Sequence, residues 1–200
     1  MWSRSVMVGL VFVTLIGGLP SAADAQAREG FWFGVGGGYG SAGISCDECD
    51  TEGREGSGVA YLRGGWTLNQ RTLVGVDFNI WNKTAREDDL EMTINLYNVT
   101  GALTFYPVAT SGWFVKAGAG VSTIDVDLDF DGSNVSAELG TGFGFTAGAG
   151  YDFRLGRMIS VTPAFGYWYG RPGDLKFASE PLFTNWQQNV FEFTVGITFH

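Results

Sequence analysis

Four carboxylates and a serine in one short segment have the spacing of a calcium-binding loop. Residues 127–138 read D-L-D-F-D-G-S-N-V-S-A-E, which matches the EF-hand pattern D-x-D-x-D-G-x5-E. In that pattern, hard oxygen ligands surround Ca²⁺ and the glycine permits a sharp turn. The oxygen donors would be Asp127, Asp129, Asp131, the Ser133 carbonyl and Glu138. The segment is therefore a candidate Ca²⁺ site.

The same segment can also be read as the extension of a β-hairpin. Acidic side chains stand at every second position, at Asp125, Asp127, Asp129 and Asp131, with apolar ones between them. This alternation is typical of a β-strand with one polar face. An EF-hand proper would have helical flanks, and Val135 supplies no oxygen at the ninth loop position. A calcium site and an extended hairpin both remain open.

The only two cysteines, Cys46 and Cys49, form the motif C-D-E-C. In an oxidising compartment this spacing predicts a small disulfide. A redox C-x-x-C motif would need a βαβ context, which the flanking sequence lacks. A metal site would need further ligands, and no histidine lies nearby. We therefore expect a disulfide that fixes a loop.

Catalytic groups are scarce in this sequence. Nucleophilic hydrolysis needs a base such as histidine beside a serine, and the single histidine is His200 at the chain end. Paired carboxylates can activate water, but the aspartates here share one acidic segment without a partner base. We expect no enzyme.

The first 25 residues have the features of a cleaved export signal. Arg4 precedes a continuous apolar run that ends at Leu19, and Ala23–Ala25 supplies an A-x-A cleavage site. The run is shorter than the ~20 apolar residues of a transmembrane helix. We predict a signal peptide over residues 1–25 and a mature domain over residues 26–200.

A period of two dominates the mature chain. Over Leu139–Phe153, one set of alternating positions is mostly apolar or aromatic, and the other is mostly glycine. Such alternation predicts a strand, here longer than the usual five or six residues. Eight segments share the pattern, namely Phe31–Gly40, Val59–Leu68, Thr72–Trp81, Tyr97–Tyr106, Trp113–Thr123, Leu139–Phe153, Ile159–Gly170 and Val190–Phe199. An even number of strands suits a bacterial membrane barrel.

The connections alternate in length. The long, polar ones are Ser41–Ser57, Asn82–Glu91, Ile124–Glu138 and Arg171–Gln188, and the short ones are Asn69–Arg71, Pro107–Gly112 and Arg154–Arg157. Long external loops and short periplasmic turns are the signature of outer-membrane barrels. Hydrocarbon cannot satisfy an open strand edge, so the barrel must close. We predict an all-β, eight-stranded antiparallel up-and-down transmembrane β-barrel with both termini in the periplasm.

The lumen-facing positions are expected to carry glycines, small polar residues and a few charges. The charged residues are Arg63, Asp77, Lys116, Asp152 and Glu192. Folding the strands about their turns pairs Arg63 with Asp77 and Lys116 with Asp152, and leaves Glu192 without a partner. Around Leu96 the apolar residues change from even to odd positions, which predicts a bulge or a late entry into lipid. Such a lumen could be filled or leave a narrow passage.

The opening strand F-W-F-G-V-G-G-G-Y-G (Phe31–Gly40) and the closing strand V-F-E-F-T-V-G-I-T-F (Val190–Phe199) resemble those of small outer-membrane β-barrel proteins. These form the opacity-protein and surface-antigen superfamily, akin to the transmembrane domain of outer-membrane protein A. The resemblance implies insertion by the barrel-assembly machinery, which reads an aromatic C-terminal strand. Here His200 follows Phe199, which departs from that pattern.

We therefore expect a monomer in the bacterial outer membrane with a structural or surface-interaction role. Its partners would be outer-membrane lipid and lipopolysaccharide, whose phosphates an acidic collar could meet through divalent cations. The alternative is a passive narrow channel for small solutes, and a lipid-modifying enzyme is a third reading. A net charge of −9 argues against nucleic acid. No cofactor is expected apart from the candidate Ca²⁺.

Overall fold

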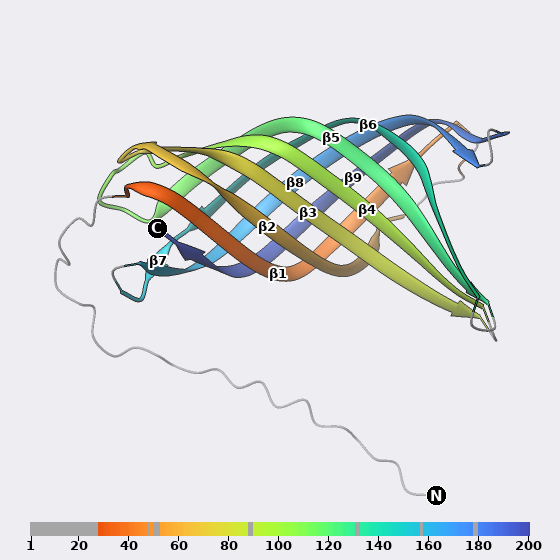
Figure 1. The fold of residues 1–200 in the computed structure, drawn as a ribbon, viewed down its shortest axis with the longest axis horizontal. Helices are drawn as coiled ribbons and strands as arrows, with labels where there is room; N and C mark the ends of the chain where they lie inside the picture. Colours follow the sequence, from red (N-terminus) through yellow and green to blue (C-terminus); the bar gives the residue numbers. More distant parts are fainter. Residues whose placement is uncertain are drawn as a thin grey trace, which may run out of the picture.

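The computed structural model describes residues 28–47, 49, 53–87, 90–130, 133–156, 158–177 and 180–200. The predicted signal peptide, residues 1–25, lies outside these ranges. The strands are β1 Gly30–Ser45, β2 Glu55–Asn69, β3 Thr72–Glu87, β4 Leu90–Phe105, β5 Trp113–Phe130, β6 Ser133–Tyr151, β7 Phe153–Arg154, β8 Ile159–Phe177 and β9 Glu180–Phe199 (Figure 1). Within the described ranges, no helix has the length and apolar character needed to cross a membrane.

These strands form one closed antiparallel barrel. Strands that follow one another in the chain are paired, except that β6 and β7 both pair with β8, and β1 pairs with β9 to close the sheet. Backbone pairing with β8 is interrupted at Asp152. The short β7 then pairs with β8 in line with β6. Because β6 and β7 together form one strand of the barrel wall, the barrel has eight strands in up-and-down order. The predicted fold class is confirmed.

The connections that the sequence analysis treated as long loops are mostly strand. β3 and β4 remain paired as far as Glu87 and Leu90, and β5 and β6 as far as Phe130 and Ser133. Between β5 and β6 the alternating acidic and apolar residues support a regular ladder, which fits the extended-hairpin reading of that segment. The external connections are therefore shorter than the predicted bounds. We call this side of the barrel the hairpin end. The opposite side, with the tight turns and His200, is the turn end (Figure 1).

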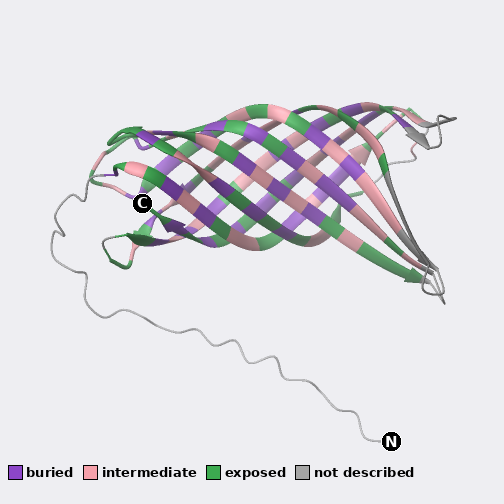
Figure 2. Ribbon diagram, viewed as in Figure 1, coloured by how far each residue is buried: buried purple, intermediate pink, exposed green. Residues whose placement is uncertain are grey.

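Burial alternates along the strands, as Figure 2 shows. Apolar residues on one side of the alternation are exposed on the outer wall, among them Phe31, Val35, Leu62, Trp66, Val76, Leu103, Val115, Phe165, Phe193 and Ile197. On β9 the outward apolar set runs from Phe191 to Phe199, eight residues apart. At about 3.4 Å per residue and a tilt of about 40°, that span is about 21 Å high, close to the band of outer-membrane barrels. We call this girdle the apolar belt.

The change of parity near Leu96 has a different cause from the one expected. β4 pairs with β3 and β5 without a register shift from Leu90 to Phe105, so no bulge lies there. Leu96 is fully buried and points into the barrel. Ile94 on the same parity packs against buried apolar residues, whereas Met92 is exposed. The prediction of a bulge was wrong, and entry of the strand into lipid at Tyr97 stays a prediction.

The belt makes a prediction for β9. Val195 lies midway between Phe191 and Phe199, so Val195→Lys places an ammonium group at the bilayer midplane. We expect a loss of about 2–4 kcal/mol in the free energy of unfolding in phospholipid bilayers.

The matched control is Asn82→Lys on β3, because Asn82 is exposed beyond the last outward apolar residue of that strand. It should cost about 0–1 kcal/mol. Equal losses in the two variants, measured by urea titration, would contradict the assigned belt.

Candidate functional site in the barrel interior

Large apolar side chains fill the interior toward the hairpin end. We call this cluster the tryptophan plug, and its buried members are Ala42, Val59, Trp81, Leu96, Ile124, Trp168, Leu175, Trp186 and Val190. The partly buried Ile44, Ile94, Leu139 and Phe183 pack against it, together with Cys46 and Cys49. The expectation of an interior with mainly small residues was therefore wrong at this level of the barrel.

Each tryptophan of the plug also satisfies its indole N–H. Trp81 donates to the Gly40 carbonyl at 3.2 Å, and Trp186 donates to Gln188 at 3.0 Å. Gln188 in turn donates to the hydroxyl oxygen of Ser122 on β5 at 2.9 Å. Since buried polar groups are costly when unpaired, these bonds fix the orientation of the rings. The side chains of the plug therefore have a defined packing arrangement.

Lumenal glycines make room for these large groups. A methyl group on Gly40 would lie 2.5 Å from Val59 Cγ1 and 3.2 Å from Trp81 Cδ1. A methyl on Gly140 would lie 2.7 Å from Leu175 Cδ2. The glycine-rich face of the strands is therefore the complement of the plug, because small residues on one strand accommodate large residues from others.

Cys46 and Cys49 are joined by a disulfide at the edge of the plug. The sequence predicted this bond from spacing and compartment. It closes a short segment after β1, where Asp47 N donates to the Thr184 carbonyl of β9 at 3.2 Å. The disulfide therefore lies where the first hairpin meets the last strand.

A layer of charged side chains crosses the middle of the interior. Lys116 on β5 and Asp77 on β3 form an ion pair, and both side chains are almost fully buried. Arg63 lies opposite Asp77 in register, as predicted, but its Nη2 donates to Thr198 Oγ1 at 3.3 Å. Glu192, which had no predicted partner, accepts a bond from the Trp168 indole at 3.1 Å.

The predicted pairing of Lys116 with Asp152 was wrong. Lys116 lies opposite Gly148, four residues from the expected partner. The hairpin of β5 and β6 turns earlier than the predicted pairing requires, and the register shift between Ile124 and Asp125 recovers only one residue of that difference. Lys116 consequently crosses β4 to reach Asp77.

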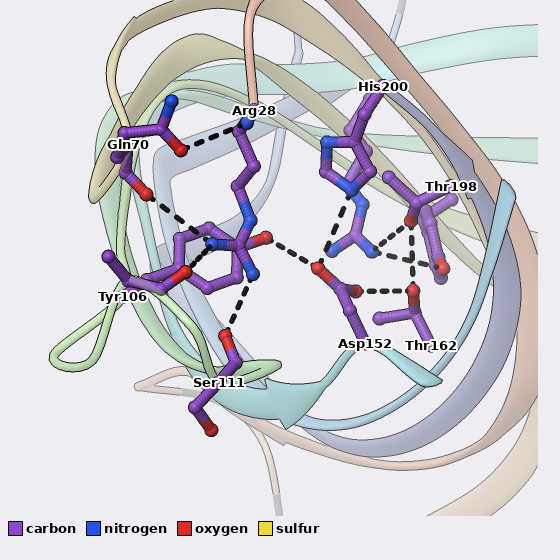
Figure 3. Close-up of polar contacts among 11 residues, drawn as sticks. Arg28, Gln70, Tyr106, Ser111, Asp152, Thr162, Thr198 and His200 are labelled. Carbon is purple, nitrogen blue, oxygen red and sulfur yellow. Dashed lines mark hydrogen bonds and ion pairs between the residues drawn. The ribbon is translucent and has the colours of Figure 1, made fainter. Parts of the chain in front are cut away.

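Asp152 anchors a separate polar cluster at the turn end (Figure 3). It accepts hydrogen bonds from Tyr106 at 2.6 Å and from Thr162 at 2.7 Å. His200 Nε2 lies 3.6 Å from the carboxylate, an ion pair when the imidazole is protonated. One imidazole and two hydroxyl groups therefore surround the buried carboxylate of Asp152.

Arg28 completes this cluster from the N-terminal side. Its guanidinium stacks on Tyr106, with Cζ 3.5 Å from the ring centroid. It donates to the carbonyls of Gln70, Ala109 and Ser111 at 3.4, 3.1 and 2.8 Å. Desolvation by burial lowers the pKa of Arg28. One cation therefore ties two neighbouring turns together across the mouth of the barrel, as Figure 3 shows.

A second apolar cluster lies with these polar groups, formed by Trp32, Leu73, Tyr106, Phe114 and Ala164. Between it, Arg63 and Asp152 is a pocket with room for about one water molecule. The arrangement does not resemble a hydrolase site, since the Thr162 hydroxyl donates to Asp152 and His200 also contacts Asp152 instead of Thr162. What this cluster can do chemically is stabilise a buried charge, that of the Asp152 carboxylate.

The acidic segment belongs to the hairpin of β5 and β6. Asp127 lies opposite Ser136, and Glu138 lies opposite Asp125, so these residues belong to a paired ladder. Asp127 accepts a bond from Asn95 at 2.8 Å, and Glu138 accepts one from Thr141 at 2.9 Å. Asp131 lies outside the described residues, as do the side chains of Asp129 and Ser133. The extended-hairpin reading fits this backbone, and Ca²⁺ binding stays a prediction.

Sequence reasoning missed Arg28, Tyr106 and the interior tryptophans. Tyr106 follows the lipid-facing Phe105 and so has inward parity, a signal that was available. Trp81 and Trp168 likewise occupy the parity opposite to the belt. For Arg28 no local signal exists, because its partners come from turns 42 to 83 residues away.

The Asp152 cluster predicts a pH-dependent stability. The ionised Asp152 carboxylate accepts the bonds of this cluster, so its contribution to stability is lost when acid protonates it, near the ordinary carboxyl range of about pH 4 and below. Asp152→Asn should lower the free energy of unfolding at pH 7 by about 2–4 kcal/mol. Below about pH 4 the free energy of unfolding of the parent should approach that of the variant, as measured by urea unfolding.

Glu91→Gln is the matched control, because Glu91 pairs with Arg86 on an exposed hairpin. It should leave the unfolding midpoint at pH 7 close to that of the parent. A difference between parent and Asp152→Asn that does not change with pH would show that the carboxylate charge is not what stabilises the fold.

The calcium hypothesis predicts a melting temperature that rises with millimolar Ca²⁺ and not with Mg²⁺, since a loop of this ligand set prefers the larger ion. Glu138→Gln should abolish the rise, whereas Glu91→Gln should retain it. Absence of a shift in the parent, measured by circular dichroism, would reject the hypothesis.

Comparison with known proteins identifies the family. The attachment invasion locus protein Ail of Yersinia pestis, in complex with the heparin analogue sucrose octasulfate, is 14% identical, with 86% of this chain and 99% of that chain covered and a TM-score of 0.58. Neisserial surface protein A is 16% identical, with coverages of 84% and 96% and a TM-score of 0.55. No curated protein matches the sequence. The family model of the outer membrane protein β-barrel domain matches residues 10–199 of the sequence, and the chain therefore belongs to that bacterial outer-membrane family.

Proposed function

We propose that this protein is a closed structural barrel that meets external partners through its long hairpins. The observation that carries the proposal is the tryptophan plug, whose nine buried residues occupy the lumen toward the hairpin end. Below it, buried ion pairs and hydrogen bonds occupy the middle and the turn end. Eight-stranded barrels are just wide enough for side chains to fill, and this interior fits that description.

The proposed orientation places the turn end in the periplasm and the hairpin end outside. Short turns and longer external hairpins are the usual arrangement of this class. Both Arg28 and His200 lie at the turn end (Figure 3), so in the proposed orientation both face the periplasm. Surface interaction then falls to the four hairpins between β1 and β2, β3 and β4, β5 and β6, and β8 and β9.

A surface role agrees with the fold comparison. Ail, described as an attachment invasion locus protein, shares the barrel architecture. The passive-channel reading has weaker support, because solutes would have to displace the plug and the charged layer. A lipid-modifying enzyme has weaker support too, because His200 contacts Asp152 within a structural cluster at the turn end.

Planar-bilayer recording tests the closed lumen. We expect the purified, refolded barrel to give no discrete conductance steps at 100 mV in 1 M KCl, because the buried side chains of the plug occupy the lumen. A channel-forming barrel reconstituted in the same membrane serves as the positive control. Reproducible steps from the parent protein would favour the passive channel and overturn the closed-barrel proposal.

A further inference from the structure

We propose that one water molecule is a structural ligand of this barrel, held in the small pocket at the turn end. Its partners are Trp32 on β1, Arg63 on β2, Thr198 on β9, and Asp152 at the break between β6 and β7. The water joins the two sides of the seam between the first and last strands to the far wall. This site is independent of the membrane orientation and of the closed lumen toward the hairpin end.

The pocket is small and has both apolar and polar walls. The volume open to the centre of a water molecule is about 10 Å³, which suits one bound water and no larger ligand. Leu73 and Phe114 supply apolar walls, whereas Arg63 and Asp152 supply polar ones. A site of this size holds water only where it offers the molecule about two to four polar partners.

Two of the walls carry N–H groups that lack an acceptor in the protein. Trp32 and Arg63 are only 4% and 7% exposed. Trp32 Nε1 and Arg63 Nε are shut off from solvent, and neither has a hydrogen-bond partner among the described residues. Indole and guanidinium N–H groups can only donate, and a donor left unpaired in the interior is costly. Both groups therefore require an acceptor.

A shared pocket distinguishes these two donors from other unpaired groups. Several buried polar atoms of the described residues also lack a partner, among them both side-chain atoms of Asn79. Of these residues, Trp32 and Arg63 are the two that line the pocket. One acceptor placed there can satisfy both N–H groups at once.

The Arg63 guanidinium is held in position beside the pocket. Its Cζ lies 4.7 Å from the ring centroid of Tyr61 and 5.8 Å from that of Phe114. Nη2 donates to Thr198 Oγ1 at 3.3 Å. A methyl group on Gly34 would lie 3.0 Å from Arg63 Nε and 3.3 Å from Thr198 Oγ1, so the unpaired donor and this hydroxyl oxygen lie close together on one wall.

The pocket also offers acceptors that the protein does not use fully. Asp152 Oδ1 accepts a bond from Thr162 and Oδ2 accepts one from Tyr106, whereas a carboxylate has about four acceptor sites. Because the Thr162 hydroxyl donates to Asp152, the Thr198 hydroxyl donates to Thr162 at 3.0 Å. Thr198 Oγ1 accepts from Arg63 and keeps one lone pair for a further donor.

Water is the ligand that matches this set of donors and acceptors. It accepts from Trp32 and Arg63 and donates to Asp152 and Thr198. A halide ion would accept the same two N–H bonds, but it would lie beside the Asp152 carboxylate and be repelled by it. A cation would face two donors, one of them on a guanidinium group. A neutral molecule that both accepts and donates meets neither penalty.

The direct test is a high-resolution crystal structure of the refolded barrel, from crystals grown in sodium chloride and again in sodium bromide. We expect one density peak within about 3.2 Å of both Trp32 Nε1 and Arg63 Nε in both crystals, with no anomalous signal from bromine. Absence of the peak would overturn the proposal. An anomalous peak in the bromide crystals would overturn it as well, because the ligand would then be an anion.

A double-mutant cycle tests the same bridge in solution. Trp32→Phe removes the indole N–H, and Thr198→Val removes the hydroxyl oxygen. We expect each change to raise the equilibrium constant for unfolding, measured by urea titration and circular dichroism. The double variant should fall short of the product of the two effects by about fivefold, because either change alone already disrupts the shared water.

The matched control cycle combines Thr198→Val with Trp81→Phe, because Trp81 donates to the Gly40 carbonyl within the plug. There the two effects should multiply to within about twofold. Multiplicative effects in the Trp32 cycle would show that Trp32 and Thr198 share no ligand and would reject the bridge. Heat-dependent electrophoretic mobility checks folding, and if Trp32→Phe does not fold, the crystals of the parent decide the question. Neither measurement bears on the conductance test of the closed lumen.

Discussion

Backbone hydrogen bonding in a medium without water is the constraint on which the rest of this structure depends. Each unpaired N–H or C=O group in hydrocarbon costs several kcal/mol, so a sheet that faces lipid must have no free edge. The pairing of β1 with β9 meets that demand. Closure in turn fixes the alternation of every strand, with one face in the belt and the other in a narrow interior.

A closed barrel of eight strands leaves an interior that must be filled with matching shapes and charges. Here glycines such as Gly40 and Gly140 leave space into which Trp81 and Leu175 fit. The charges are placed so that each buried group has a partner on another strand, as Lys116 and Asp77 do. The same side chains that fill the lumen also join strands that do not pair with each other. They therefore both pack the interior and cross-link the barrel wall.

The fold could be predicted because a period of two is a local signal that each strand carries by itself. The outward set of β9, from Phe191 to Phe199, is readable from that strand alone. The register of β5 against β6 was not readable, because it depends on where the acidic hairpin turns and on the shift at Ile124. The contacts between interior side chains were harder still to predict. Arg28 reaches turns far along the chain, and Leu96 resembles a lipid-facing residue until its neighbours across the lumen are known.

The seam between the first and last strands has a consequence for assembly. Phe33 pairs with Phe199, so the chain ends meet only after everything between them is in place. Arg63 and Thr162 both bond Thr198 across this region, which means that the closing strand also completes part of the interior. Contacts of such long sequence separation form slowly. A chain without β9 would leave the facing edges of β1 and β8 unpaired at the same time, so this one strand supplies both of the last two ladders of the barrel.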